Sequence, residues 1–314
     1  MVAAQATTAP SWFDHLLAAC LPIVPRPIVR WVSMRYVAGE TAEDMVRTVR
    51  ELNQKGMRAT VDLLGEFITD LQQAHNTCAS YQAILKRLHD EQLDANISIK
   101  LSALGLLLDE GVCTQLVRTL VETAAQHNNF VRIDMEDTPC TDATLRVYTA
   151  VRREFPNVGI VMQAYLRRTL GDVRSLMAQG MSHFRLCKGI YREPHALAYQ
   201  TRELINANYA LVLEDCFRGG AFVGIATHDE ALVWHGQRLI DQYRLGTDRY
   251  EFQMLLGVTE PLRDLLVQGG HPVRIYVPFG GDWYAYCLRR LRENPTVAGH
   301  VFRSLLARVL GKVE

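Results

Sequence analysis

Eight short apolar runs recur along this chain, and amphipathic stretches separate them. The runs cover residues 61–66, 97–105, 130–137, 158–165, 183–191, 221–229, 250–257 and 273–281. They start at intervals of roughly 25–40 residues, about the length of one strand and one crossover helix. This rhythm predicts an α/β fold in which eight strand–helix units close into a (β/α)8 TIM-like barrel.

Charged and polar residues stand where these runs end, and barrels of this type place their chemistry at the carboxyl ends of the strands. The residues at these ends are Glu66, Lys100, Asp134, Gln163, Arg185, Lys188, His228 and Tyr276. A buried strand has no structural need for so many polar groups at one end. The pattern therefore predicts a binding or catalytic site at that end of the barrel.

The segments on either side of the eight runs are predicted to be helical. Prolines between residues 22 and 27 divide an apolar segment into two short helices, and a third helix begins at Thr41 and stops at Gly56. We therefore expect an N-terminal helical arm over residues 1–57, the barrel over 58–294 and a C-terminal helix over 295–314.

Helices are also expected between the runs. One is predicted to have Asp142 as its N-cap and to end at Pro156. Another opens at Glu260, with Pro261 in its first turn. The stretch 194–219 is a long insert between two runs and is expected to hold a loop followed by a long helix.

The composition excludes some classes of function. The 314 residues are 48% hydrophobic and 22% charged, as in an ordinary globular protein, and the formal net charge is zero. Nothing therefore favours nucleic acid or an anionic surface as a partner. Seven cysteines without a CxxC pair fit the reduced thiols of a cytoplasmic protein, and Cys187 and Cys287 fit small buried residues.

The apolar segment 11–36 is rich in Trp, Phe, Leu, Ile and Val and admits two interpretations. Its residues can pack on the barrel or on a second copy of the chain. Alternatively, they form a surface that touches a membrane or another partner at its periphery. No apolar run is long enough to span a bilayer.

The segment YCLRRLREN is a first candidate for chemistry. Tyr286, Arg289, Arg290 and Glu293 have the spacing i, i+3, i+4 and i+7, which lines one face of a helix. Two guanidinium groups beside a tyrosine can bind a carboxylate in bidentate fashion. A solvated basic helix face is the alternative.

The segment RIDMED is a second candidate. Alternation along the strand predicts that Ile133 faces the helices and Asp134 faces inward. An inward carboxylate is costly unless it is paired, and Lys100 on the neighbouring strand is the expected partner. A purely structural ion pair is the alternative.

Two further segments carry polar groups at strand ends. Arg185 and Lys188, followed by Gly189, suit phosphates or an electron-rich ring, while Thr227 and His228 end the sixth run. No metal-binding spacing such as HExxH is present, so no metal is expected. Because GxGxxG and GxxxxGK[ST] are also missing, a dinucleotide would lie across the end of the barrel.

The order of these motifs resembles the proline dehydrogenase family, FAD-dependent barrel enzymes of proline catabolism. The matching strings are GETAED, DLLGE, ISIKLSALG, RIDMED, VMQAY, RLCKGIYRE, ATHD, EFQMLLG, YVPFG and YxxRRxxEN. They run in order from about residue 39 to residue 294, so the resemblance covers most of the chain. The length is similar to that of the stand-alone bacterial form.

The resemblance implies roles for individual residues, with Asp134 and Arg185 at the catalytic centre and Arg185 beside the flavin N5. The residues that match substrate-binding positions are Lys100, Asp134, Tyr276, Tyr286, Arg289, Arg290 and the apolar Leu255. The residues that match cofactor-binding positions are Met135, Gln163, Arg185, Lys188, Gly189, Thr227, His228 and Glu293. One departure is Ile190, where the family more often has a smaller alanine.

The activity implied by the resemblance is hydride transfer from C5 of L-proline to FAD, with electrons passed to a membrane quinone. A cytoplasmic enzyme that contacts the inner face of the membrane through its arm would fit that acceptor. Two other readings stay open from the residues alone. One is a barrel lyase or aldolase that forms a Schiff base through Lys100 or Lys188, and the other is a non-catalytic scaffold.

Overall fold

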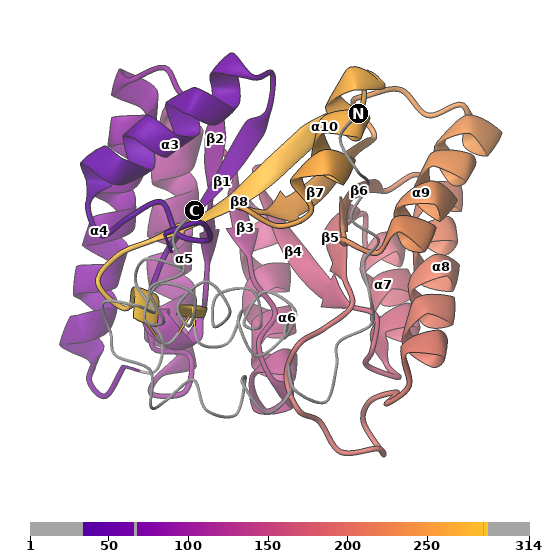
Figure 1. Cartoon of the computed structure of the whole chain (residues 1–314). Helices are drawn as coiled ribbons and strands as arrows, with labels where there is room; N and C mark the ends of the chain where they lie inside the picture. The colour runs from indigo at the N-terminus through magenta and orange to yellow at the C-terminus, as the bar shows by residue number, and fades with distance from the viewer. Residues whose placement is uncertain (1–33, 66–67, 285, 288–314) are drawn as a thin grey trace, which may run out of the picture.

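The computed structural model describes residues 34–65, 68–284 and 286–287. Eight parallel strands form a closed barrel in the order in which they occur along the chain (Figure 1). They are β1 (Arg58–Leu63), β2 (Ala95–Ile99), β3 (Val131–Ile133), β4 (Val158–Gln163), β5 (His183–Cys187), β6 (Phe222–Ala226), β7 (Tyr250–Leu255) and β8 (Val273–Phe279). The predicted (β/α)8 barrel is confirmed.

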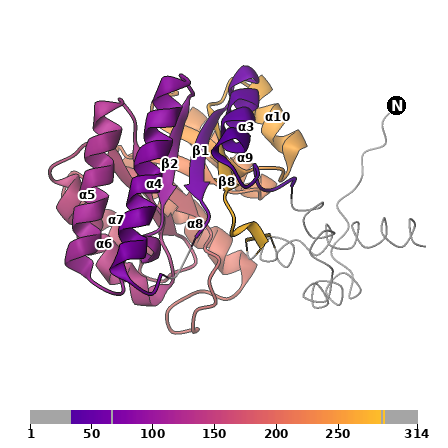
Figure 2. The ribbon, with the colours of Figure 1, turned by 90° about the vertical axis from the view of Figure 1, so that its left-hand side faces the viewer.

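Helices surround this barrel (Figures 1 and 2). Those described are α3 (Ala42–Gln54), α4 (Leu71–Asp90), α5 (Glu110–Gln126), α6 (Thr138–Arg152), α7 (Thr169–Ala178), α8 (Arg202–Arg218), α9 (Glu230–Tyr243) and α10 (Glu260–Gln268), with a 3-10 turn at Ser102–Leu104. Within the described part of the chain, no helix is long and apolar enough to cross a membrane.

Of the predicted N-terminal arm, the structure describes residues 34–57, which include helix α3. Thr41 caps it as predicted, and the side chain of Asp44 completes a capping box. The chain just before α3 joins the barrel, because the Ala38 amide donates to the Pro278 carbonyl at the end of β8. The rest of the arm and the predicted C-terminal helix lie outside the described residues. The division of the chain into arm, barrel and final helix stays a prediction.

The prediction that Asp142 caps a helix is wrong. Helix α6 begins at Thr138, with Asp137 in the N-cap position and Pro139 in the first turn. Proline lacks an amide hydrogen and has a helix-compatible φ, so an Asp-Thr-Pro sequence starts a helix here before Asp142 is reached. The helix also ends at Arg152, four residues short of Pro156.

The alternation of side chains along the strands separates an apolar layer from a polar interior. Residues such as Val61, Ile97 and Ile133 face the helices and join one large core cluster. The alternate positions carry buried polar groups, among them Asp62 and Arg132, which are each 1% exposed. The interior of this barrel is therefore filled largely by hydrogen-bonded and charged side chains.

Candidate active site

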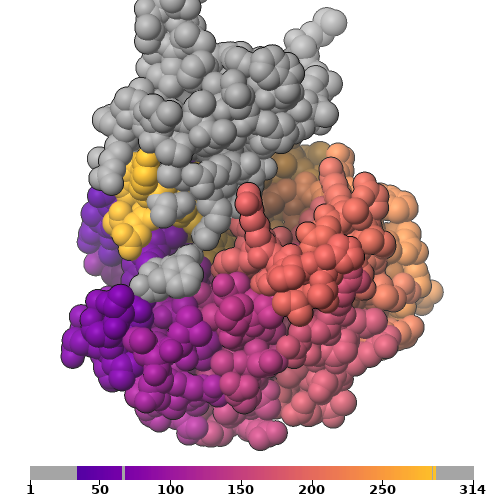
Figure 3. Space-filling view, turned by 90° about the horizontal axis from the view of Figure 1, so that it is seen from below, coloured from indigo at the N-terminus to yellow at the C-terminus, as the bar shows by residue number. Residues whose placement is uncertain are grey.

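A cavity of about 660 Å³ lies at the carboxyl ends of the strands. Figure 3 views the molecule from this end. The cavity is lined by all the predicted site residues that the structure describes, namely Lys100, Asp134, Met135, Gln163, Arg185, Lys188, Gly189, Thr227, His228, Leu255, Tyr276 and Tyr286. Four other residues named from the sequence, Glu66, Arg289, Arg290 and Glu293, lie outside the described residues.

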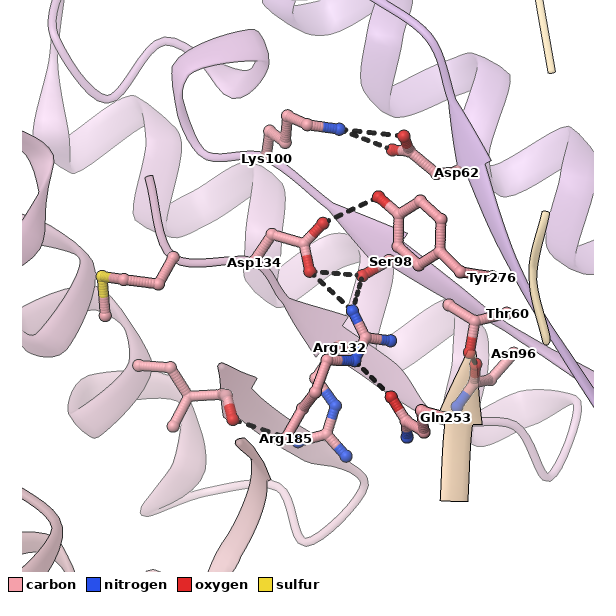
Figure 4. Close-up of polar contacts among 12 residues, drawn as sticks. Thr60, Asp62, Asn96, Ser98, Lys100, Arg132, Asp134, Arg185, Gln253 and Tyr276 are labelled. Carbon is pink, nitrogen blue, oxygen red and sulfur yellow. Dashed lines mark hydrogen bonds and ion pairs between the residues drawn. The ribbon is translucent and has the colours of Figure 1, made fainter. Parts of the chain in front are cut away.

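Asp134 is the centre of the hydrogen-bond network in this cavity (Figure 4). It follows β3 directly, and its carboxylate accepts from Ser98 Oγ at 2.7 Å, from Arg185 Nη1 at 2.8 Å and from the Tyr276 hydroxyl at 2.9 Å. The guanidinium carbon of Arg185 lies 5.3 Å from the centroid of the Tyr276 ring. Burial and then the nearby Asp134 carboxylate raise the pKa of Tyr276 well above its usual value. Tyr276 is therefore a neutral donor at ordinary pH.

The expected ion pair between Lys100 and Asp134 is not formed. Lys100 Nζ instead lies 2.9 Å from both carboxylate oxygens of Asp62, on β1 (Figure 4). The register explains this, because Asp62 lies opposite Ser98 and its side chain faces the same interior layer. Arg185 crosses the interior from β5 and takes the place at Asp134 that Lys100 was expected to occupy.

Asp62 was missed by sequence reasoning, although it is a charged residue inside an apolar run. Burial raises its pKa above the usual value, while the Lys100 ammonium opposes that shift. Gln253 was missed for the same reason, since it lies within the run of β7 and its side-chain oxygen accepts from Arg185 Nε. A polar residue at an inward-facing position of a buried strand is the signal that identifies both.

A second ion pair holds Lys188 at the rim of the cavity. Its Nζ lies 2.7 Å from Asp229 Oδ2, which also accepts from Arg202 Nη2 at 2.7 Å and from Asn206 Nδ2 at 3.0 Å. Burial alone would raise the pKa of Asp229, but the hydrogen bonds from these three side chains lower it well below its usual range. Asp229 also caps α9 through the Ala231 amide at 3.2 Å.

Gly189 is required by the shape of the chain after β5. Its φ is +104°, and a Cβ atom at this position would lie 2.1 Å from the ring of Tyr165.

His228 Nε2 accepts a hydrogen bond from the Leu255 amide at 2.9 Å, which assigns the ring proton to Nδ1. Burial raises the pKa of the Cys187 thiol to about 11, so this cavity residue is a neutral thiol rather than a nucleophilic thiolate.

Gln163 has an incomplete set of partners. Its Nε2 donates to the carbonyls of Met135 at 2.7 Å and Glu136 at 2.9 Å. Its Oε1 is buried and has no hydrogen-bond partner among the described residues. Because an unpaired buried carbonyl oxygen is costly, the cavity is suited to a ligand that supplies an N–H donor at this point. Over residues 34–65, 68–284 and 286–287, no group of three or more potential metal ligands comes together.

Comparison with known proteins identifies the family. The family model described as proline dehydrogenase matches residues 45–303. This chain belongs to the proline dehydrogenase family. The matched range includes Arg289, Arg290 and Glu293, which the structure does not describe.

Two bacterial proline dehydrogenases show the likeness over nearly the whole chain. Proline dehydrogenase 1 of Bacillus subtilis (strain 168) is 33% identical over 272 residues, which cover 87% of this chain and 90% of that protein. The proline dehydrogenase of Deinococcus radiodurans is 33% identical over 301 residues, or 92% of this chain and 97% of the relative.

A solved structure supports the fold. Proline utilization A (PutA) from Bdellovibrio bacteriovorus, inactivated by N-propargylglycine, matches with a TM-score of 0.80 and 24% sequence identity. The match covers 85% of this chain but 33% of that longer protein. At this identity the likeness shows a shared barrel.

Proposed function

We propose that this proline dehydrogenase family member binds FAD in the 660 Å³ cavity and oxidises L-proline to Δ1-pyrroline-5-carboxylate. FAD, when bound, supplies the oxidising power by accepting a hydride from C5 of proline at its N5 atom. The observation that carries the proposal is that one cavity holds a guanidinium and a buried carbonyl oxygen that lacks a partner.

The residues present fit a flavin. Gln163 Oε1 would accept a hydrogen bond from the N–H of the ring system, which would satisfy an oxygen that now has no partner. Arg185 would stabilise the negative charge that develops on the reduced ring. Met135, Lys188, Gly189, Thr227, His228 and Glu293 are proposed to hold the remainder of the cofactor.

The substrate side needs groups for a carboxylate and an apolar ring. Arg289 and Arg290 are proposed to bind the carboxylate, and Leu255 to form an apolar wall of the pocket. Tyr276 and Tyr286 line the same cavity, as does Lys100, which brings a positive charge. Asp134 orients both Arg185 and Tyr276 through its hydrogen bonds.

The contacts of both lysines disfavour the Schiff-base alternative. Lys100 Nζ lies 2.9 Å from Asp62 Oδ2 and Lys188 Nζ lies 2.7 Å from Asp229 Oδ2, so each amine would have to leave its carboxylate before it could attack a carbonyl carbon. Borohydride reduction in the presence of a carbonyl substrate should therefore trap no covalent adduct on either residue.

The decisive experiment is anaerobic addition of L-proline to the purified protein. The preparation should be yellow, and its flavin absorbance band at about 450 nm should bleach on addition of proline. A protein that stays colourless with added FAD, or a flavin that proline does not reduce, would refute the proposal. N-propargylglycine should inactivate the enzyme irreversibly, and excess proline should protect against it.

A quinone is the proposed electron acceptor, and the N-terminal arm is the proposed membrane contact. The apolar residues of segment 11–36 motivate this part of the proposal. Sedimentation with quinone-containing vesicles should be weaker after deletion of residues 1–36. Equal sedimentation of both forms would remove the role of the arm.

A further inference from the structure

The guanidinium of Arg185 is held along two edges. On one edge, Nη1 donates to Asp134 Oδ1 at 2.8 Å and to Ser98 Oγ at 3.1 Å. On the other edge, Nε donates to the side-chain oxygen of Gln253 (Figure 4). A planar group with partners on both edges is fixed in rotation as well as in position.

The amide of Gln253 can face only one way. Its Nε2 donates to Glu251 Oε1 at 2.6 Å, and the same oxygen accepts from Arg274 Nε at 2.7 Å. Burial alone would raise the pKa of Glu251, but the nearby Arg274 guanidinium opposes this effect, and the pKa lies below its usual value. Glu251 is therefore an ionised group that only accepts hydrogen bonds. A flipped amide would place its oxygen against this carboxylate and its nitrogen against the Nε–H of Arg185.

Gly224 provides the space for this amide. Gly224 lies between Arg185 and Glu251 in the register of β5, β6 and β7. A Cβ atom on Gly224 would lie 2.4 Å from Gln253 Nε2. The glycine does not have a left-handed φ, so the contact with Gln253 rather than the backbone requires it.

We propose that Gln253 is a positioning residue that sets the orientation of Arg185, and that Glu251 and Gly224 fix Gln253 in turn. The consequence for the reaction rests on the proposed function, in which Arg185 stabilises charge on the reduced flavin. Loss of the Gln253 contact leaves a cation that points in a different direction. The rate of flavin reduction should then fall while the KM for proline changes little.

Three variants separate this role from a general effect on folding. Gln253→Met has a similar length but no amide, and Gly224→Ala keeps every polar group while displacing the amide. Thr60→Val is the matched control, because it removes another side-chain hydrogen bond inside the barrel, a partly buried one to Asn96 at 2.6 Å, without touching Arg185. The rate of flavin reduction should fall about tenfold to a hundredfold in Gln253→Met, the usual effect of one hydrogen bond to a charged group.

Gln253→Glu gives a pH signature that a structural role would not produce. The carboxyl group introduced by this substitution could, when protonated, donate to Glu251 and accept from Arg185, as the amide does. When ionised, it would repel the Glu251 carboxylate at this distance. The reduction rate of Gln253→Glu relative to the natural protein should therefore rise as the pH falls.

The orientation itself is measured by NMR of the protein labelled with ¹⁵N at arginine Nε, without reliance on activity. One exchange-protected signal should vanish in Arg185→Lys, which assigns it. The same signal should be lost or strongly shifted in Gln253→Met and Gly224→Ala and should persist in Thr60→Val. An unchanged signal in Gln253→Met, or a reduction rate within about twofold of the natural protein, would overturn the inference. A natural protein that binds no flavin would instead refute the proposed function and leave the NMR result standing.

Discussion

Two lysines that line the same cavity each pair with a carboxylate, and the pKa values of these two carboxylates are shifted in opposite directions. Asp62, with a side chain 1% exposed, has one lysine and a raised pKa. Asp229, with a side chain 7% exposed, accepts from Lys188, Arg202 and Asn206 and has a lowered pKa. The number of donors and the depth of burial, rather than the residue types in the pair, decide which protonation state is favoured. The inner pair should therefore be fragile and the outer one tolerant of substitution.

The largest expected effect is that of Lys100→Met, which leaves the Asp62 carboxylate buried without its ammonium. Removal of one partner from a buried pair costs about 3–5 kcal/mol of unfolding free energy. The matched variant Lys188→Met should cost about 1 kcal/mol or less, because Arg202 and Asn206 still bind Asp229. Urea denaturation of both variants checks the comparison, and equal losses would contradict it.

A second test adds Asp62→Asn to Lys100→Met. The double variant has no buried charge at this position, so it should recover about 1–3 kcal/mol relative to Lys100→Met alone. The measurement is a double-mutant cycle by urea denaturation. Additive losses would show that the two residues stabilise the barrel independently.

The outer pair should show the reverse kind of coupling. Lys188→Met and Arg202→Met should each have a small effect, because the other cation remains at Asp229. The double variant should lose more than the sum of the two, by about 0.5–1 kcal/mol, since no cation then contacts the carboxylate and only the neutral donors of Asn206 and the Ala231 amide remain. A sum that accounts for the full loss would show that the cations do not substitute for each other.

The smallest expected effect is a pair of opposite pH slopes. The lowered pKa of Asp229 stabilises the fold above pH 3.8, its unperturbed value, and this contribution is lost as the pH falls further. The raised pKa of Asp62 means that the folded protein takes up a proton first, so its contribution grows as the pH falls toward 3.8. Compared with the natural protein, Asp229→Asn should gain in relative stability as the pH falls below 3.8, and Asp62→Asn should lose relative stability as the pH falls toward 3.8 from above. Parallel slopes would contradict the contrast.

The fold was predictable because the strand–helix rhythm is repeated so often. The gathering of Asp134, Arg185 and Lys188 was predictable too, since the carboxyl ends of parallel strands meet at one rim. Their partners were not predictable, because the reach of Lys100 to Asp62 depends on strand register and side-chain length. Asp62 and Gln253 were not predicted either, because they lie within strands and not at the ends of the apolar runs. The roles given to Arg289, Arg290 and Glu293 stay predictions.

The side-chain amide of Gln163 continues the sheet where β3 stops. Strand β4 extends three residues past its last pairing with β3, and Nε2 of Gln163 bonds to the carbonyls of Met135 and Glu136 beyond that point. The nitrogen of this one carboxamide thus connects β4 to the backbone that follows β3, while its oxygen is on the side of the cavity. A substitution of Gln163 that suits a different ligand would also remove the hydrogen bonds that hold the two strands together. This position therefore has little freedom to change its ligand contact without weakening the barrel.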